Sequence, residues 1–271
     1  MKTFLSALLM LSFQMALADT TPLHGAGEII ARMGVMYLPD AVVKKLLPEG
    51  LTLAAEEFAP EGHHPLIIGF GLQNGVHPIL NGVDLPRVTN KVYLENALLI
   101  PFVKYKGSYA AGDYRNGPFV HMPIMYLDDM KAVIAGKAYA FPKKHVAMMM
   151  TEYGYHIASF DRREIADVGF LPTGSAPVNQ EVFKSNLEKV GVLLNQPLIG
   201  KTGNTFICSF YDWKIQKARM APAPMHMKLQ ETYLQGLAPL EHHFDRLDQS
   251  FWGSFDIKTS WTLTSPKLCS R

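Results

Sequence analysis

The chain has 271 residues, of which 48% are hydrophobic and 18% are charged. This composition is that of a globular protein and excludes a disordered or low-complexity chain. Lysine and arginine together number 26, against 24 aspartate and glutamate residues. A protein that grips nucleic acid through its phosphates needs a basic excess or stripe, so this balance predicts no nucleic-acid partner.

The first 18 residues have the layout of a secretory signal peptide. Lys2 gives a positive start, an apolar run extends from Phe4 to Leu17, and Ala16-Leu17-Ala18 forms a small-x-small cleavage site. The alternative is a membrane anchor, but a bilayer span needs roughly 20 apolar residues and this run is shorter. We therefore expect a periplasmic or secreted mature chain of residues 19–271, with no membrane contact after cleavage.

Two cysteines, Cys208 and Cys269, remain after the expected cleavage. Export to an oxidising compartment allows a disulfide between them. The alternative is that Cys208 is a free, buried side chain of the apolar run 205–210. Two cysteines at this spacing make neither a zinc site nor a redox pair.

The predicted elements are many short strands and few helices. After a polar lead-in to about His24, a short helix is predicted over 40–47, between Pro39 and the turn Pro48-Glu49-Gly50. Further helices are predicted over 128–135 and 180–194. Strand-like runs, separated by Gly, Pro, Asn and Asp clusters, cover 51–54, 65–72, 92–103, 120–127, 145–153, 155–160, 205–210, 213–218, 225–231 and 252–263.

This order predicts one mainly β domain of the α+β class, without internal repeat or linker. We expect a closed or conical, β-barrel-like antiparallel sheet with a few peripheral helices. The pairs His63-His64 and His242-His243 lack the i, i+4 spacing of helical metal ligands, and a solvated loop is predicted for the second pair. The core, rather than a ligand cage, is the expected place of Trp213, Trp252 and Trp261.

Two adjacent lysines, Lys143 and Lys144, follow Phe141 and Pro142 inside an otherwise apolar run. Neighbouring strand residues point to opposite faces, so one lysine faces inward unless the segment bends. Desolvation lowers the pKa of a buried lysine from about 10.4, and the free amine is a nucleophile towards carbonyl groups. The alternative is a solvated lysine pair at a strand end. In an extended segment, Phe141 and His145 share the face of Lys143.

Around these lysines the sequence resembles the acetoacetate decarboxylase family. The densest match is 125–144, where Gly136-Lys137 stands in place of the family's usual Gly-Arg. Weaker matches follow in the same order along the chain, and they are Tyr37 with 40–51, Tyr93-x-Glu95, 208–214, 238–240 and the final apolar strand. The resemblance covers roughly residues 28–263 and implies a conical, β-barrel-like fold.

The resemblance also implies roles for particular residues. Lys143 resembles the lysine that forms the Schiff base, Lys144 resembles its cationic neighbour, and Glu95 resembles the carboxylate that orients the intermediate or moves a proton. The alternative for Glu95 is an exposed carboxylate on a strand. Contacts with the substrate are expected from Phe141, His145, Tyr93 and Leu38.

Three departures from the family pattern bear on the substrate. Leu38 stands where the decarboxylases carry an arginine suited to a carboxylate, Ala138 replaces a usual Glu, and His145 replaces an aliphatic residue. These changes alter the pocket rather than the nucleophile, and they favour a keto acid or ketone other than acetoacetate. A substitute cation is available from one of three arginines, among which the sequence does not choose: Arg32, Arg87 and Arg115.

The expected activity is that of an exported lyase that decarboxylates a β-keto acid through an imine on Lys143. The same imine allows aldol addition and dehydration of a keto acid, and a barrel that only binds a small apolar ligand is a third possibility. The Schiff-base mechanism requires no metal or redox cofactor. The expected partners are a small keto acid or ketone as substrate and further copies of the chain in a homo-oligomer.

Overall fold

The computed structural model describes residues 23–107, 117–237 and 239–269, and the predicted signal peptide lies outside them. The strands are β1 (Leu23–Pro39), β2 (Leu51–Leu53), β3 (His63–Leu80), β4 (Val83–Asp84), β5 (Val92–Tyr105), β6 (Phe119–Leu127), β7 (Lys143–His145), β8 (Ala147–Thr151), β9 (Gly154–Ala158), β10 (Glu164–Phe170), β11 (Leu198–Thr202), β12 (Thr205–Ser209), β13 (Tyr211–Trp213), β14 (Arg219–Pro222), β15 (Met225–Leu229), β16 (Leu240–Arg246), β17 (Gly253–Leu263) and β18 (Lys267–Leu268).

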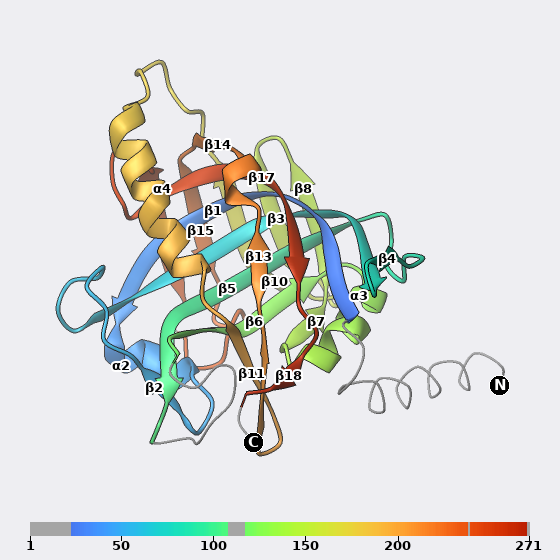
Figure 1. The fold of residues 1–271 in the computed structure, drawn as a ribbon. Coiled ribbons are helices and arrows are strands. Elements are labelled where there is room, and N and C mark those ends of the chain that lie inside the picture. Colours follow the sequence, from blue (N-terminus) through green and yellow to red (C-terminus); the bar gives the residue numbers. More distant parts are fainter. Residues whose placement is uncertain (1–22, 108–116, 238, 270–271) are drawn as a thin grey trace.

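The described helices are few and lie at the periphery of the sheet (Figure 1). They are α2 (Asp40–Val43), α3 (Met130–Gly136), α4 (Gln180–Leu194) and the 3-10 helices η1 (Lys44–Leu46), η2 (Lys137–Tyr139) and η3 (Ile215–Lys217). None of the helices in the described ranges is both long and apolar enough to cross a membrane.

The centre of the fold is a run of long antiparallel strands in the order β17, β1, β3, β5, β6 (Figure 1). Parallel pairings extend this sheet from β6 to β7 and to β11, and another joins β16 to β17. The mainly β class with peripheral helices is therefore confirmed, but the sheet is mixed rather than wholly antiparallel. Of the two expected forms, the closed barrel is wrong, because the sheet is not closed.

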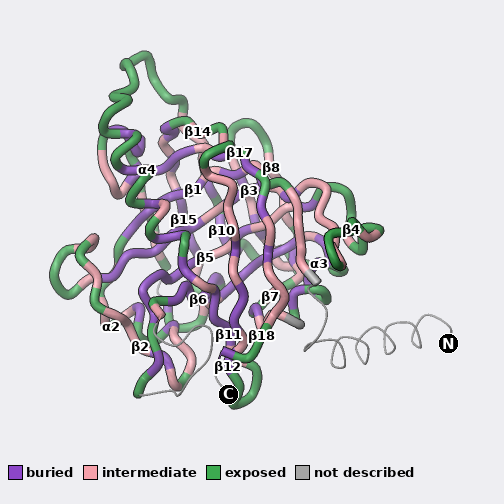
Figure 2. Tube along the Cα trace, viewed as in Figure 1, coloured by how far each residue is buried: buried purple, intermediate pink, exposed green. Residues whose placement is uncertain are grey.

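Both faces of the central sheet are covered. The strands β8, β9, β10, β15 and β16 form a second layer, and Val168, Met225 and Phe244 of that layer share an apolar cluster with Ile68 and Leu98 of the central strands. The opposite face packs against the second half of the chain, including α4 and β13. Figure 2 accordingly shows the central strands as mostly buried backbone, with exposed segments at the rim.

Side-chain caps define the starts of the two longer helices. The Asn179 side chain accepts a hydrogen bond from the Val182 N–H at the start of α4, and Asp129 accepts from Lys131 and Ala132 at the start of α3. Such caps satisfy backbone donors that the first turn leaves unpaired. The predicted helices over 180–194 and 128–135 are confirmed.

The longest strand missing from the sequence analysis is β1. Its residues Ile29, Met33, Val35 and Met36 are buried although they point to different faces, because the strand is covered on both sides. A strand buried on both faces shows no alternation of apolar and polar residues, so its period of two is lost from the sequence.

The predicted solvated loop at His242-His243 is wrong, because both residues lie in β16 and pair with β15. His242 is half-buried, with its ring 4.4 Å from that of Phe244, while His243 is exposed. The polar residues of this run lie on the solvent side of a second-layer strand, which is why the sequence resembles a loop.

Cys208 and Cys269 form a disulfide with a Cα–Cα distance of 5.0 Å. Both cysteines are buried, and the bridge ties β12 to the C-terminal segment. It closes a loop with a sequence separation of 61 residues, so the alternative of a free Cys208 is not what the structure shows.

We predict that removing this bridge with a Cys208→Ala/Cys269→Ala double variant lowers the free energy of unfolding by about 4 kcal/mol. This value is the free-energy equivalent of the conformational entropy that the unfolded chain regains when a loop of this length is no longer closed. Thermal unfolding of the wild type with and without reductant measures the effect. The double variant serves as the control, since reductant is not expected to change its melting temperature. Equal melting temperatures for the reduced and oxidised wild type would contradict the prediction.

Candidate active site

Cross-strand register brings Lys143 to the same face of the sheet as the central strands' small residues. Parallel pairing places Lys143 opposite Met125, and Met125 pairs with Ala97 on β5. Ala97 pairs with Gly69 on β3, and Gly69 pairs with Met33 on β1. Paired residues in a sheet project to the same side, so the five positions form one row.

Glu95 lies in the next row on the same face. It pairs with Gly71 on β3 and with Leu127 on β6, and Leu127 pairs with His145. Glu95 and Lys143 are therefore two strands and one row apart, within reach of each other's long side chains.

Lys143 extends along helix α3. Its Nζ lies 3.5 Å from the carbonyl oxygen of Ala132 and donates to it. A Cβ at Gly136 would lie 2.2 Å from Cε and 2.3 Å from Cδ of Lys143. The glycine is thus required by the path of the lysine side chain, and this explains the Gly136 of the sequence motif.

Burial is the main influence on the lysine amine, and it lowers the pKa of Lys143 below its ordinary value. The carboxylate of Glu95 opposes this by favouring the ammonium form. Burial also raises the pKa of Glu95, while Lys143 and a hydrogen bond from Gln73 act in the opposite direction. The two groups therefore approach each other in proton affinity, which suits proton transfer between them.

A hydrogen-bonded chain fixes the orientation of Glu95. The Trp261 indole Nε1–H donates to Oε1 of Gln73 at 2.8 Å, and Nε2 of Gln73 donates to Oε1 of Glu95 at 3.1 Å. An indole can only donate, so the amide oxygen of Gln73 must face Trp261 and its NH₂ group must face the carboxylate. This chain favours Glu95 as an acceptor, which is its ionised form.

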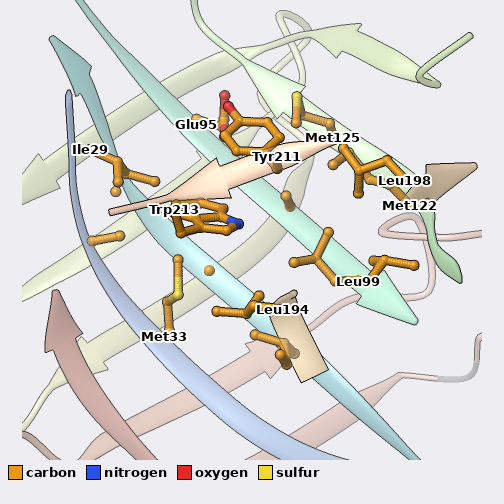
Figure 3. A pocket seen from close by; sticks show the side chains of 16 residues that line it. Ile29, Met33, Glu95, Leu99, Met122, Met125, Leu194, Leu198, Tyr211 and Trp213 are labelled. Carbon is orange, nitrogen blue, oxygen red and sulfur yellow. The ribbon is translucent and has the colours of Figure 1, made fainter. Parts of the chain in front are cut away.

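An apolar pocket extends from Glu95 over the same sheet face (Figure 3). Its floor next to Glu95 consists of small residues, and Tyr211 and Trp213 of β13 lie against it with their rings stacked 4.8 Å apart. Among the described lining residues only Glu95 carries a charge. The lining is Ile29, Ala31, Met33, Ile67, Gly69, Gly71, Glu95, Ala97, Leu99, Val120, Met122, Met125, Leu194, Leu198, Tyr211 and Trp213.

The structure brings several predicted residues together around Glu95 and Lys143. Tyr93 is buried on the face of Glu95, and its pKa is raised well above the ordinary value, first by burial and then by the Glu95 charge. Phe141 is buried and stacks on Tyr139 at 5.6 Å. Glu95 lines the pocket, so the alternative interpretation of it as an exposed carboxylate on a strand is wrong.

Lys144 is not brought to the site, which corrects its predicted place. It is exposed on the opposite face, where its Nζ lies 5.7 Å from the ring centre of Tyr126. His145 has the face of Lys143, but its ring packs 4.8 Å from that of Phe160 and its Nε2 lies 3.2 Å from the Asp128 carbonyl oxygen. His145 therefore borders the site rather than lining the pocket.

Leu38 is also misplaced by the sequence prediction. It pairs with His64 and packs against the apolar cluster between the two layers, on the face opposite Met33 and the pocket. An arginine at this position would not reach a substrate in the pocket. The alternation of β1 decides this, because positions 29, 31, 33 and 35 already take the pocket face.

Two of the three arginines proposed as substitute cations, Arg32 and Arg87, are described, and neither lines the pocket. Arg32 forms a two-point ion pair with Asp256, at 2.7 and 2.9 Å, and donates to the carbonyl oxygen of Pro224. Arg87 is exposed in a loop, and Arg115 lies outside the described residues. The described part of the site thus offers no guanidinium to a carboxylate.

Several site residues were missed or misassigned in the sequence. Trp213 was expected in the core and instead lines the pocket, while Gln73 and Trp261 hold Glu95. Gln73 is a polar residue in an otherwise apolar strand run, and that signal alone could have indicated a buried partner. No group of three His, Cys, Asp or Glu side chains that could hold a metal ion occurs among the described residues.

The fold is that of acetoacetate decarboxylase and of acetoacetate decarboxylase-like enzymes. The chain resembles the enduracididine biosynthesis enzyme MppR complexed with pyruvate, with a TM-score of 0.51, 13% identity and coverage of 92% of this chain and 90% of that chain. A second structure of MppR, complexed with the condensation product of pyruvate and imidazole 4-carboxaldehyde, gives a TM-score of 0.50 at 13% identity, covering 92% and 89%.

Two further solved structures show the same likeness. An acetoacetate decarboxylase gives a TM-score of 0.51 at 14% identity, covering 91% of this chain and 88% of that chain. An acetoacetate decarboxylase-like enzyme from Sphingomonas wittichii RW1 gives 0.50 at 14%, covering 92% of each chain. No protein-family model and no curated protein matches the sequence. At such identities these likenesses establish the fold.

We predict that Gly136→Ala displaces the Lys143 side chain and lowers the rate of amine modification at Lys143 more than tenfold. The added methyl group would occupy the place of Cδ and Cε, which belong to a flexible side chain that can move. The melting temperature should not fall, because alanine is the better helix former by about 1 kcal/mol. Gly191→Ala in α4 is the matched control, since a Cβ there meets no atom within 4 Å. Unchanged labelling of Lys143 in Gly136→Ala, measured by mass spectrometry, would contradict the prediction.

A second prediction concerns the charge of Glu95. Glu95→Gln should lower the pKa of Lys143 further, because the carboxylate that favours the ammonium is lost while burial remains. The midpoint of pH-dependent labelling of Lys143 should therefore move to lower pH. Lys144→Gln should leave that midpoint in place, since Lys144 lies on the opposite face. A midpoint that rises in Glu95→Gln would refute the assigned pairing.

Proposed function

We propose that the protein is a lysine Schiff-base lyase that decarboxylates a β-keto acid, with Lys143 as the nucleophile. The observation that carries this proposal is the position of Lys143 on the same sheet face as Glu95, which lines an apolar pocket, together with the burial that lowers the pKa of the lysine. The likeness to acetoacetate decarboxylase supports it at the level of the fold.

The reaction begins when the neutral amine of Lys143 attacks the ketone carbon. The carbinolamine loses water, and the protonated imine withdraws electrons from the neighbouring carbon. The bond to the β-carboxylate breaks, carbon dioxide leaves, and the bonding pair forms an enamine. Glu95, whose pKa is raised by burial, takes up a proton from solvent and delivers it to that carbon. Hydrolysis of the imine then releases the ketone and the amine.

The character of the pocket supports loss of the carboxylate. No described lining residue carries a positive charge, and the one carboxyl group among them, that of Glu95, is negative while ionised. A bound carboxylate is therefore poorly stabilised in the ground state, whereas its charge disperses as carbon dioxide forms, so the site favours the transition state.

Aldol addition with dehydration is the second candidate, and the complex of MppR with a condensation product is the observation that favours it. The imine would lose an α-proton instead of carbon dioxide, and the enamine would attack an aldehyde. A pyruvate-derived product keeps its carboxylate, however, and the described lining offers no cation to hold it. We therefore place decarboxylation first.

We also propose that the protein is exported. The disulfide between Cys208 and Cys269 supports this, because such bridges persist in oxidising compartments. A non-catalytic ligand-binding protein is the alternative to both enzymatic proposals, and it would form no covalent bond to its ligand.

Borohydride trapping tests the proposed nucleophile. Incubation with acetoacetate, pyruvate and a panel of 1,3-dicarbonyls, followed by borohydride, should give a reduced adduct on Lys143 that peptide mass spectrometry locates. Lys143→Gln should lower the yield of adduct at least a hundredfold. Lys104→Gln, a change at an exposed lysine of β5, should retain the wild-type yield. An adduct on Lys144 alone, or none from any compound, would reject the proposal. Release of carbon dioxide then separates decarboxylation from aldol chemistry.

A further inference from the structure

The floor of the pocket contains two glycines, Gly71 and Gly69, and backbone packing requires only the first of them. A Cβ at Gly71 would lie 2.4 Å from the carbonyl oxygen of Ile30, so the backbone excludes any side chain there. A Cβ at Gly69 would meet only Met33, at 3.7 and 3.9 Å, which is ordinary contact. Glycine within a strand costs stability and commonly marks the close approach of another group. The space above Gly69 is thus part of the pocket.

The small floor continues across neighbouring strands. Gly69 pairs with Ala97, and Gly71 pairs with Ala31, so four small residues adjoin Glu95 in two rows. Tyr211 and Trp213 lie on the other side of this space, as Figure 3 shows. We call the part of the pocket between these small strand residues and the two aromatic rings the channel. Its shape suits a flat or unbranched apolar group.

The far end of the channel is wholly apolar. Leu99, Leu194 and Leu198 lie away from Glu95 in Figure 3. Glu95 and Leu99 are four residues apart on β5, which corresponds to about 14 Å between their backbone positions at roughly 3.4 Å per residue. An extended alkyl chain advances roughly 1.3 Å per carbon, from a carbon–carbon bond of about 1.5 Å. The length therefore far exceeds that of the methyl group of acetoacetate.

We infer that the substrate carries an unbranched apolar chain of several carbons, up to about ten, on its ketone carbon. This inference rests on the proposed function. The carbonyl group lies at Lys143 and Glu95, and the chain extends over Gly69 and Ala97 towards Leu99 and Leu194. The substrate class is thus a medium-chain 3-oxo acid, and the product is the corresponding methyl ketone.

A chain-length series tests the inference. The substrates are 3-oxobutanoate, 3-oxohexanoate, 3-oxooctanoate and 3-oxodecanoate, and kcat/KM for release of carbon dioxide is measured together with the rate of borohydride-trapped adduct on Lys143. Each buried methylene should raise kcat/KM about fourfold. We therefore expect 3-oxooctanoate to exceed 3-oxobutanoate more than fiftyfold. A kcat/KM that is independent of chain length, with the Lys143 adduct present, would overturn the inference.

A matched pair of variants assigns the effect to this channel. Gly69→Val places a side chain in the channel and should reduce the ratio of the two kcat/KM values to less than fivefold. Gly169→Val on β10 adds the same side chain where a Cβ meets no atom within 4 Å, and it should keep the wild-type ratio. If Gly69→Val does not fold, Ala97→Val, in the same row, makes the same test. An unchanged ratio in a folded channel variant would also overturn the inference.

The two proposals fail in different ways. If no substrate of any length gives an adduct on Lys143, the proposed function fails. If the adduct forms on Lys143 at similar rates for all lengths, the Schiff-base function stands and only the medium-chain substrate is rejected.

Discussion

Desolvation of the Lys143 amine is the constraint on which the rest of the site depends. A lysine in water is protonated at neutral pH and does not attack a ketone, so the role proposed for Lys143 requires that water be removed from its amine without leaving an uncompensated charge. Here one carboxylate, Glu95, compensates partly, and its own burial brings the two proton affinities together. The Trp261–Gln73–Glu95 chain then holds the carboxylate in place.

Small residues make this arrangement possible, and each does so for a separate reason. Gly136 leaves the path that the Lys143 side chain follows along α3, while Gly71 allows β1 and β3 to approach. Gly69 and Ala97 instead leave unfilled space beside Glu95. Gly136 and Gly71 are thus required by packing, whereas Gly69 and Ala97 border the pocket.

The two faces of the central sheet have different roles. One face packs against a second layer of strands and carries the stabilising apolar cluster, including Leu38. The other face carries Lys143, Glu95 and the pocket, closed over by β13 and the end of α4. A sheet that is buried on both faces can hold an isolated pair of ionisable side chains on one of them, because packing on the other face supplies the stability that burying the pair costs.

The local features of the fold could be predicted from the amino-acid sequence. These include the helix over 180–194, the mainly β class and the opposite orientation of Lys143 and Lys144, because helix periodicity and side-chain alternation depend only on near neighbours. Which face of the central sheet carries the pocket could not be predicted and became clear from the packing of distant strands. Leu38 and Arg32 point away from the pocket, and Gln73 meets Trp261 across 188 positions of the chain, because strand register and the layer that covers each face depend on long-range packing.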